Sequence, residues 1–115
     1  MNKPVDIPVL LVERDGDIAV LVLNRPQPRN SLSEALLKAL SAALTEIKAD
    51  RSIRAVVLAA NGPAFCAGHD LKELTARRAD ADGGKAYFRQ IMTTCSGMMQ
   101  QIVTLPQPVI ACVQG

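Results

Sequence analysis

The chain has few aromatic residues and few of the histidines and cysteines that bind zinc. Its 115 residues contain no Trp, one Tyr, two Phe and a single histidine, His69. The three cysteines show no C-x-x-C spacing, and there is no second histidine to complete a zinc site with them. We therefore expect no metal centre, and any hydrophobic core must be built from aliphatic side chains.

The chain also has no strong charge of one sign and no long apolar run. A formal net charge of +2, with no basic cluster larger than Arg77-Arg78, argues against nucleic acid as a partner. The leading stretch MNKPVDIPVLLVERDG carries acids and prolines early, so it resembles neither a signal peptide nor a membrane anchor. An odd number of cysteines in a chain this apolar indicates reduced thiols. These features predict a cytoplasmic protein with no membrane association.

What is present is one domain of alternating strands and helices. Nearly half of the residues are hydrophobic (49%), which is enough for a core, and the length allows one domain. An Asp-Gly pair between two β-branched runs predicts a hairpin, and later runs alternate with helical patterns, so we expect an α/β fold with a parallel sheet. The predicted strands cover 9–13, 18–24, 53–60 and 109–113, and the predicted helices cover 31–50, 71–79 and 85–105.

Finer features of these elements can also be predicted. Ser31 with Glu34 fits a capping box at the start of the first helix, although Ser33 could be the cap instead. The continuous apolar runs 53–60 and 109–113 are typical of strands buried on both faces, yet nothing after the second run would cover its far face. One side of the last helix is expected to carry Phe88, Ile91, Met92, Cys95, Met98, Met99 and Ile102. Its methionines Met92, Met98 and Met99 could line an acyl-chain pocket, but core packing is the simpler interpretation.

The stretch AFCAGHDLKEL, residues 64–74, contains the candidates for chemistry. Cys66 and His69 could pair as a thiol nucleophile and its base, but no orienting third group is evident and a buried structural thiol is favoured. Glu73 could act as an acid or base, whereas a solvated surface glutamate is the simpler interpretation.

Three segments in this order and spacing resemble the crotonase superfamily, the enoyl-CoA hydratase/isomerase group. They are LNRPQPRNSLS after the second strand, IRAVVLAANGPAFCAGHDLKEL across the third, and LPQPVIACVQG at the end. The segment GHDLKEL is most similar to the branch called enoyl-CoA hydratase domain-containing proteins. The resemblance implies a crotonase-like (ClpP/crotonase) α/β fold, of which residues 1–115 would be the N-terminal portion.

The resemblance implies that the protein binds acyl-CoA thioesters and stabilises a thioester enolate in an oxyanion hole. By motif position, the backbone N–H of His69 would be the first donor of that hole, and its imidazole would be secondary, though a part for the imidazole stays open. Coenzyme A contacts would come from Pro28 and Arg29 and from the backbone of the later segment. Arg29 and Lys72 would be the cations for phosphate, although either could simply be solvated. The later segment comprises Ala67, Gly68, His69, Asp70, Leu71 and Lys72.

The same resemblance sets expectations for the whole protein. A coenzyme A thioester would be the substrate, with no prosthetic group, and the family implies a homo-oligomer, either trimer or hexamer. In the family the second oxyanion donor and the catalytic carboxylates follow the segment that ends here at Gly115. We therefore expect a hydratase or isomerase of fatty acid metabolism as the whole protein, and no hydratase turnover from the 115-residue chain alone. The alternative is a truncated, non-catalytic module that binds coenzyme A or another protein.

Overall fold

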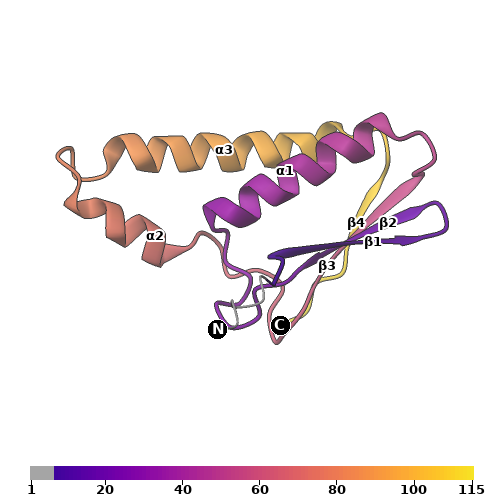
Figure 1. Cartoon of the computed structure of the whole chain (residues 1–115), viewed down its shortest axis with the longest axis horizontal. Helices are drawn as coiled ribbons and strands as arrows, with labels where there is room; N and C mark the ends of the chain where they lie inside the picture. The colour runs from indigo at the N-terminus through magenta and orange to yellow at the C-terminus, as the bar shows by residue number, and fades with distance from the viewer. Residues whose placement is uncertain (1–6) are drawn as a thin grey trace, which may run out of the picture.

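Four strands form one sheet whose spatial order, β1-β2-β3-β4, is also the chain order. The computed structural model describes residues 7–115, so the first six residues of the leading stretch compared above with a signal peptide lie outside the described residues. Figure 1 shows both long helices on one side of the sheet. The elements are β1 Leu10–Asp15, β2 Ile18–Leu23, α1 Glu34–Ala49, β3 Ala55–Ala60, α2 Leu71–Ala76, a 3-10 turn Arg77–Ala79, α3 Lys85–Thr104 and β4 Val109–Ala111.

The predicted hairpin and the predicted parallel pairing are both confirmed. β1 and β2 run antiparallel, and the pair Asp15–Ile18 closes a two-residue turn in which Gly16 has φ +60°. Glycine takes this left-handed conformation without the steric penalty that other residues meet. β3 joins β2, and β4 joins β3, both in parallel, because a helical connection returns the chain to the same end of the sheet each time.

The core lies between one face of the sheet and the two long helices. Alternate residues of β2 (Ala19, Leu21 and Leu23) point into it, as the two-residue period of a strand requires. The inward face of α1 has the three-and-four spacing that the sequence predicts, whereas α3 contributes a narrower stripe. The buried residues are Leu36, Leu37, Leu40, Ala43, Leu44 and Ile47 of α1 and Tyr87, Ile91, Cys95 and Met98 of α3.

The first long helix begins at Glu34 with Ser33 as its N-cap. The hydroxyl of Ser33 accepts a hydrogen bond from the N–H of Leu36 at 3.1 Å, which satisfies one of the free amides of the first turn. The capping box based on Ser31 is therefore wrong, and the alternative is confirmed. The Ser31 hydroxyl lies instead 3.3 Å from Nη1 of Arg25, in the loop before the helix.

Three predictions about burial are wrong. Met92 and Met99 of α3 are each 46% exposed, so they belong neither to the core face nor to an enclosed acyl pocket, while the buried Tyr87 was not predicted. β3 is mostly half-buried rather than buried on both faces. β4 is half-buried or exposed over its three residues, with Ile110 56% exposed.

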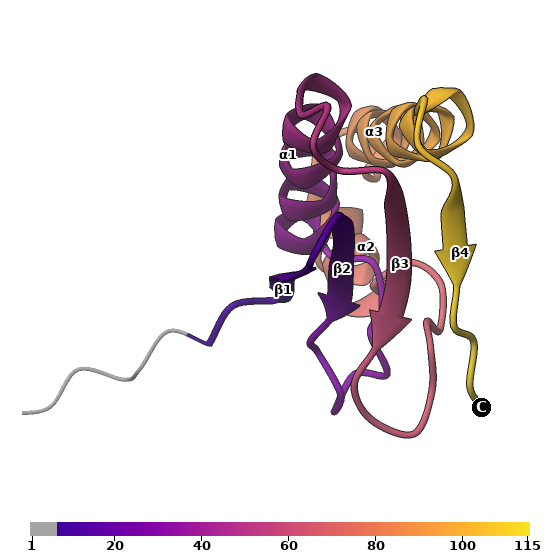
Figure 2. The same ribbon diagram turned by 90° about the vertical axis from the view of Figure 1, so that its right-hand side faces the viewer.

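The face of the sheet turned away from the helices is open and apolar. Pairing across the strands places alternate residues on this face, and Figure 2 shows β4 at the edge with no helix on that side. The residues that share it include Leu11, Val20, Val22, Val57, Ala59 and Ile110.

Two further findings bear on the sequence analysis. None of the helices in the described part of the chain is both long and apolar enough to cross a membrane. Cys66, Cys95 and Cys112 are all free thiols, as their number and the composition predict.

Candidate functional site

Two loops meet at the end of the sheet where β2 and β3 finish. Asn30 joins them: it is fully buried, and its Nδ2 donates to the carbonyl oxygens of Asn61 (2.8 Å) and Ala64 (2.9 Å). Its Oδ1 accepts from the N–H of Arg25 at 2.7 Å. With φ +56°, Asn30 also takes the left-handed conformation that asparagine tolerates better than most residues. One side chain thereby fixes the loop after β2 against the loop after β3.

The same two loops are linked by a short parallel bridge between Leu32 and His69. The N–H of Leu32 donates to the carbonyl of Gly68 at 2.7 Å, and the N–H of Asp70 donates to the carbonyl of Leu32 at 3.1 Å. In a parallel bridge of this kind, both hydrogen bonds to Leu32 are made by the residues before and after His69, namely Gly68 and Asp70. The main-chain N–H and C=O of the residue between them point away from Leu32. The peptide N–H of His69 is therefore directed away from Leu32.

The amide of His69 has no hydrogen-bond acceptor within residues 7–115. It is also outside the following helix, because α2 begins at Leu71 with Asp70 as its N-cap. A main-chain donor left unpaired beside the protein interior costs free energy, and such donors are rare unless solvent or a ligand satisfies them. This N–H is consequently available to a bound group.

Asp70 ties α2 to the loop after β2. Its Oδ1 accepts from the N–H groups of Lys72 (3.0 Å) and Glu73 (3.2 Å), and its Oδ2 lies 3.0 Å from Nη2 of Arg25. Burial alone would raise the pKa of Asp70, but the Glu73 amide and the Arg25 guanidinium outweigh burial, so that pKa lies below its usual value. The carboxylate therefore stays ionised near neutral pH and keeps Arg25 in place.

These loops border a cavity of about 570 Å³, within the usual range for small-molecule sites. Its lining includes most of the residues predicted for coenzyme A, but Arg29 and Gly68 do not line it. Three lining residues, Arg25, Gln27 and Ser31, were not predicted, although all three lie within the segment LNRPQPRNSLS. The full lining is Arg25, Gln27, Pro28, Ser31, Ala67, His69, Asp70, Leu71 and Lys72.

Arg29 is exposed beside the cavity rather than in it. Its carbonyl accepts from the N–H of Ala67 at 3.0 Å, and its φ is +53°. The backbone of Arg29 therefore helps to hold the second loop, while its side chain is exposed to solvent. Gly68 contributes through its carbonyl, which holds Leu32, and its φ of +98° suits glycine.

The alternative chemistries of this region fit the geometry less well. No hydrogen bond between Cys66 and His69 occurs in the described part of the chain, and Nε2 of His69 is buried without a partner. Glu73 is half-buried, not solvated as predicted: its Oε1 accepts from the N–H of Glu34 at 2.9 Å, at the start of α1. We assign Glu73 a structural contact that links α2 to α1.

The chain belongs to the enoyl-CoA hydratase/isomerase family, whose sequence model matches residues 13–115. It is 40% identical over 101 residues to the human mitochondrial enoyl-CoA hydratase domain-containing protein 3, covering 88% of this chain and 31% of that protein. The Xenopus laevis protein of the same name is 36% identical over 108 residues, with 94% and 35% covered. The crystal structure of an enoyl-CoA hydratase from Mycobacterium smegmatis superposes with a TM-score of 0.85 at 48% identity.

These matches confirm the predicted family and the crotonase-like α/β fold. The Mycobacterium smegmatis comparison covers 95% of this chain and 41% of the solved chain. This chain thus spans about a third of the length of the curated relatives named here, and its likeness is to one portion of them.

Proposed function

We propose that the protein is an acyl-CoA-binding member of the enoyl-CoA hydratase/isomerase type, in which the peptide N–H of His69 donates to the thioester oxygen. The observation that carries this proposal is the unpaired N–H of His69, turned away from Leu32 by the parallel bridge. The residue lines the cavity of about 570 Å³ between the two loops. The relatives named enoyl-CoA hydratase support a coenzyme A thioester as the substrate, and we propose that the protein needs no prosthetic group.

The chemistry follows from where negative charge forms. When a proton leaves carbon 2 of an acyl thioester, or water adds to carbon 3 of an enoyl thioester, charge moves onto the thioester oxygen. A donor fixed before the reaction stabilises that charge without having to reorganise, and removal of one such donor typically costs roughly 3–4 kcal/mol of transition-state stabilisation. Leu32, Gly68 and Asp70 hold the peptide of His69 on both sides, which gives the required rigidity.

Coenzyme A is proposed to lie along the same two loops. Lys72 is exposed on the rim of the cavity and has no carboxylate partner among residues 7–115, so its ammonium is available to a phosphate. Arg25 is already paired with Asp70 and is better suited to holding the cavity wall than to binding phosphate. Pro28 forms part of the cavity wall, and the exposed side chain of Arg29 would reach a phosphate only from outside the cavity.

Several wider properties also remain part of this proposal. The 115 residues are proposed to be one portion of a larger crotonase-like domain, with the second oxyanion donor and the catalytic carboxylates elsewhere in the protein. A trimer or hexamer is proposed from the family resemblance. The cytoplasmic location stays a prediction, because the human and Xenopus laevis relatives are named as mitochondrial.

The test separates the main-chain nitrogen of His69 from its side chain. His69→Ala keeps the N–H and should retain crotonyl-CoA turnover within about tenfold in the whole protein. Replacing the amide at position 69 by an ester, through incorporation of an α-hydroxy acid, removes the same N–H and should lower kcat by roughly 100- to 1000-fold. KM should change little, because the oxygen carries most of its charge only in the transition state.

An ester at position 35 is the matched control, since Ala35 is exposed in the first turn of α1, its N–H has no acceptor within residues 7–115, and it does not line the cavity. Thermal melting and crotonyl-CoA binding should show that all variants are folded. The proposal fails if His69→Ala abolishes turnover in a folded protein, or if the ester at position 69 is as active as the control.

A further inference from the structure

A second cavity lies at the opposite end of the sheet from the candidate site. Here α1 leads into β3 and α3 leads into β4, so the cavity adjoins the amino ends of these two strands, whereas the site above adjoins carboxyl ends. Its volume is about 460 Å³, which suits a small molecule. Lys48, Arg51, Ile53, Arg54, Pro106 and Gln107 line it.

Three of the lining residues are cations without a carboxylate partner. Lys48, Arg51 and Arg54 are all exposed, and none forms a salt bridge within residues 7–115. Lys48 in the last turn of α1 is stabilised there by the negative end of the helix dipole, but the two arginines follow the helix and lack that explanation. Like charges around one hollow repel one another, and a bound anion removes that repulsion.

The one carboxylate in this connection is already engaged. Asp50 lies 3.6 Å from Nη1 of Arg14, and its Oδ1 accepts from the N–H of Ser52 at 2.9 Å. The Ser52 hydroxyl and amide, with Arg14, hold the pKa of Asp50 below its usual value. Asp50 therefore remains charged and is neutralised by Arg14, which leaves the three cations uncompensated.

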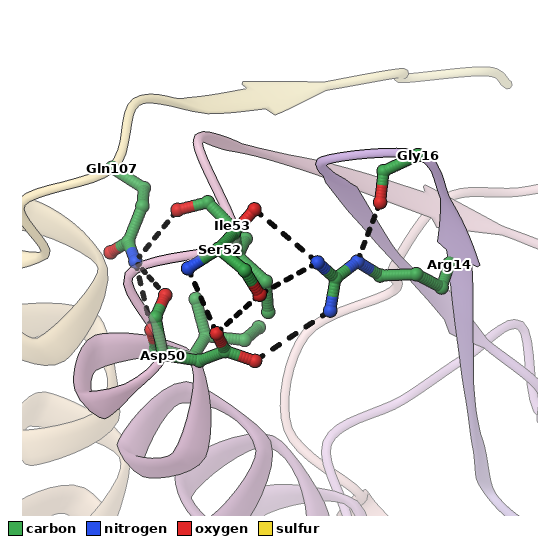
Figure 3. Close-up of polar contacts among 7 residues, drawn as sticks. Arg14, Gly16, Asp50, Ser52, Ile53 and Gln107 are labelled. Carbon is green, nitrogen blue, oxygen red and sulfur yellow. Dashed lines mark hydrogen bonds and ion pairs between the residues drawn. The ribbon is translucent and has the colours of Figure 1, made fainter.

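The connection that carries Arg51 and Arg54 is held rigidly. Figure 3 shows Arg14 reaching across from β1 to Ser52, whose Oγ accepts from Nη2 at 2.9 Å. On the other side, Nε2 of Gln107 donates to the carbonyls of Ile47 (2.8 Å) and Ile53 (3.2 Å). Cations on a fixed backbone lose less entropy when they bind an anion than cations on a flexible loop.

Gln107 is a largely buried polar residue in the lining of this cavity. The residue is only 8% exposed, and its Oε1 is buried without any hydrogen-bond partner in the described structure. Figure 3 shows Oε1 on the side of the amide away from the carbonyls that Nε2 bonds. The amide cannot be turned over to relieve this, because Oε1 would then face those carbonyl oxygens. Because Oε1 is buried, a ligand in the cavity does not reach it, and Gln107 contributes by fixing the cavity wall through Nε2.

We propose that this cavity binds a small soluble phosphomonoester. The phosphate would be bound by Arg51, Arg54 and Lys48, whose guanidinium and ammonium groups suit its oxygens. The site is separate from the cavity beside His69 and does not depend on the function proposed for that cavity.

Calorimetric titration of the whole protein with glycerol 3-phosphate at low salt tests this proposal. Glycerol 3-phosphate and methyl phosphate should both bind, and glycerol, which lacks the phosphate, should not. The double variant Arg51→Gln/Arg54→Gln should weaken binding by about tenfold or more, as expected when charge-assisted hydrogen bonds are lost. Saturating crotonyl-CoA should leave the titration unchanged.

The matched control is Arg78→Gln/Arg89→Gln, which removes the same charge from exposed positions outside the cavity and should bind as the unchanged protein does. An absence of glycerol 3-phosphate binding would overturn the proposal. So would an equal loss in the control variant, which would indicate a general charge effect, or competition by crotonyl-CoA, which would locate the phosphate in the other cavity. Equal affinity for glycerol would overturn the proposal as well, because the phosphate would then contribute nothing.

Discussion

At the scale of single residues, Asp70 joins three parts of the candidate site: the loop after β2 through Arg25, the start of α2, and the bridge through its own N–H. Its side chain is 10% exposed and that of Arg25 is 20% exposed, so water screens their interaction only partly. The pKa of Asp70 is lowered in the folded protein, so its ionised form stabilises the fold. This stability is present above the unfolded-state pKa of about 3.9 and is lost as the pH falls through the folded-state pKa.

Asp70→Asn should therefore destabilise the protein by about 1–3 kcal/mol at neutral pH, because Arg25 loses its charged partner in a half-buried place. The difference should narrow as the pH falls from about 5 toward 2, since the native carboxylate is then protonated. Urea unfolding across this pH range measures both effects, with Asp15→Asn on the exposed hairpin as the control. A difference that stays constant with pH would show that the charge of Asp70 contributes nothing.

At the scale of secondary-structure elements, the start of α1 affects the site directly, because the bridge residue Leu32 comes just before its cap. Ser33→Ala should destabilise the protein by about 1 kcal/mol, since the N–H of Leu36 loses its acceptor. Ser96→Ala, at an exposed position within α3, is the matched control and should change stability by less than about 0.5 kcal/mol. Equal effects in thermal or urea unfolding would contradict the assignment of Ser33 as the cap.

The elements that could be predicted from the sequence are those specified by local patterns. The hairpin has a glycine in its two-residue turn, and α1 has regular apolar spacing, so both lie close to their predicted bounds. The exposed Met92 and Met99 could not be excluded, because apolar spacing shows which residues are suited to burial and not how wide a face the neighbouring elements cover. The same holds for β3 and β4, whose apolar runs do not show whether a second layer is present.

In the candidate site, too, residues of one contiguous motif could be predicted, whereas residues placed by contacts between distant segments could not. Residues 67–72 could be singled out because they form one contiguous motif, and most of them line the cavity. Arg25 and Ser31 could not, since their place depends on pairing between segments about 40 residues apart in sequence, as in the 45-residue separation of Arg25 and Asp70. The orphaned Oε1 of Gln107 leaves no trace in the sequence at all, because it depends on which carbonyls its Nε2 meets.

At the scale of the whole molecule, the open face of the sheet is a contiguous apolar surface within residues 7–115. Contiguous apolar surfaces of this kind associate with other protein surfaces, and a strand with an unpaired edge favours the same outcome. We expect the isolated 115-residue chain to self-associate and to bind a dye such as ANS. Ile110→Lys should reduce both, because it places a charge within the open face.

Val103→Lys is the control for this prediction, since Val103 is 82% exposed on α3, away from the open face of the sheet. Sedimentation velocity and ANS fluorescence measure the two properties. If Val103→Lys reduced association as much as Ile110→Lys, the helical side and not the sheet would be the surface of contact.

The agreement between spatial and chain order in the sheet has a consequence for synthesis. As the polypeptide leaves the ribosome, β2 finds β1 already made, β3 finds β2, and β4 finds β3, so each strand after β1 meets a partner that has already been synthesised. Each helix likewise emerges just before the strand that it delivers to the growing edge. This portion of the protein can therefore assemble stepwise during translation, with short searches at each addition.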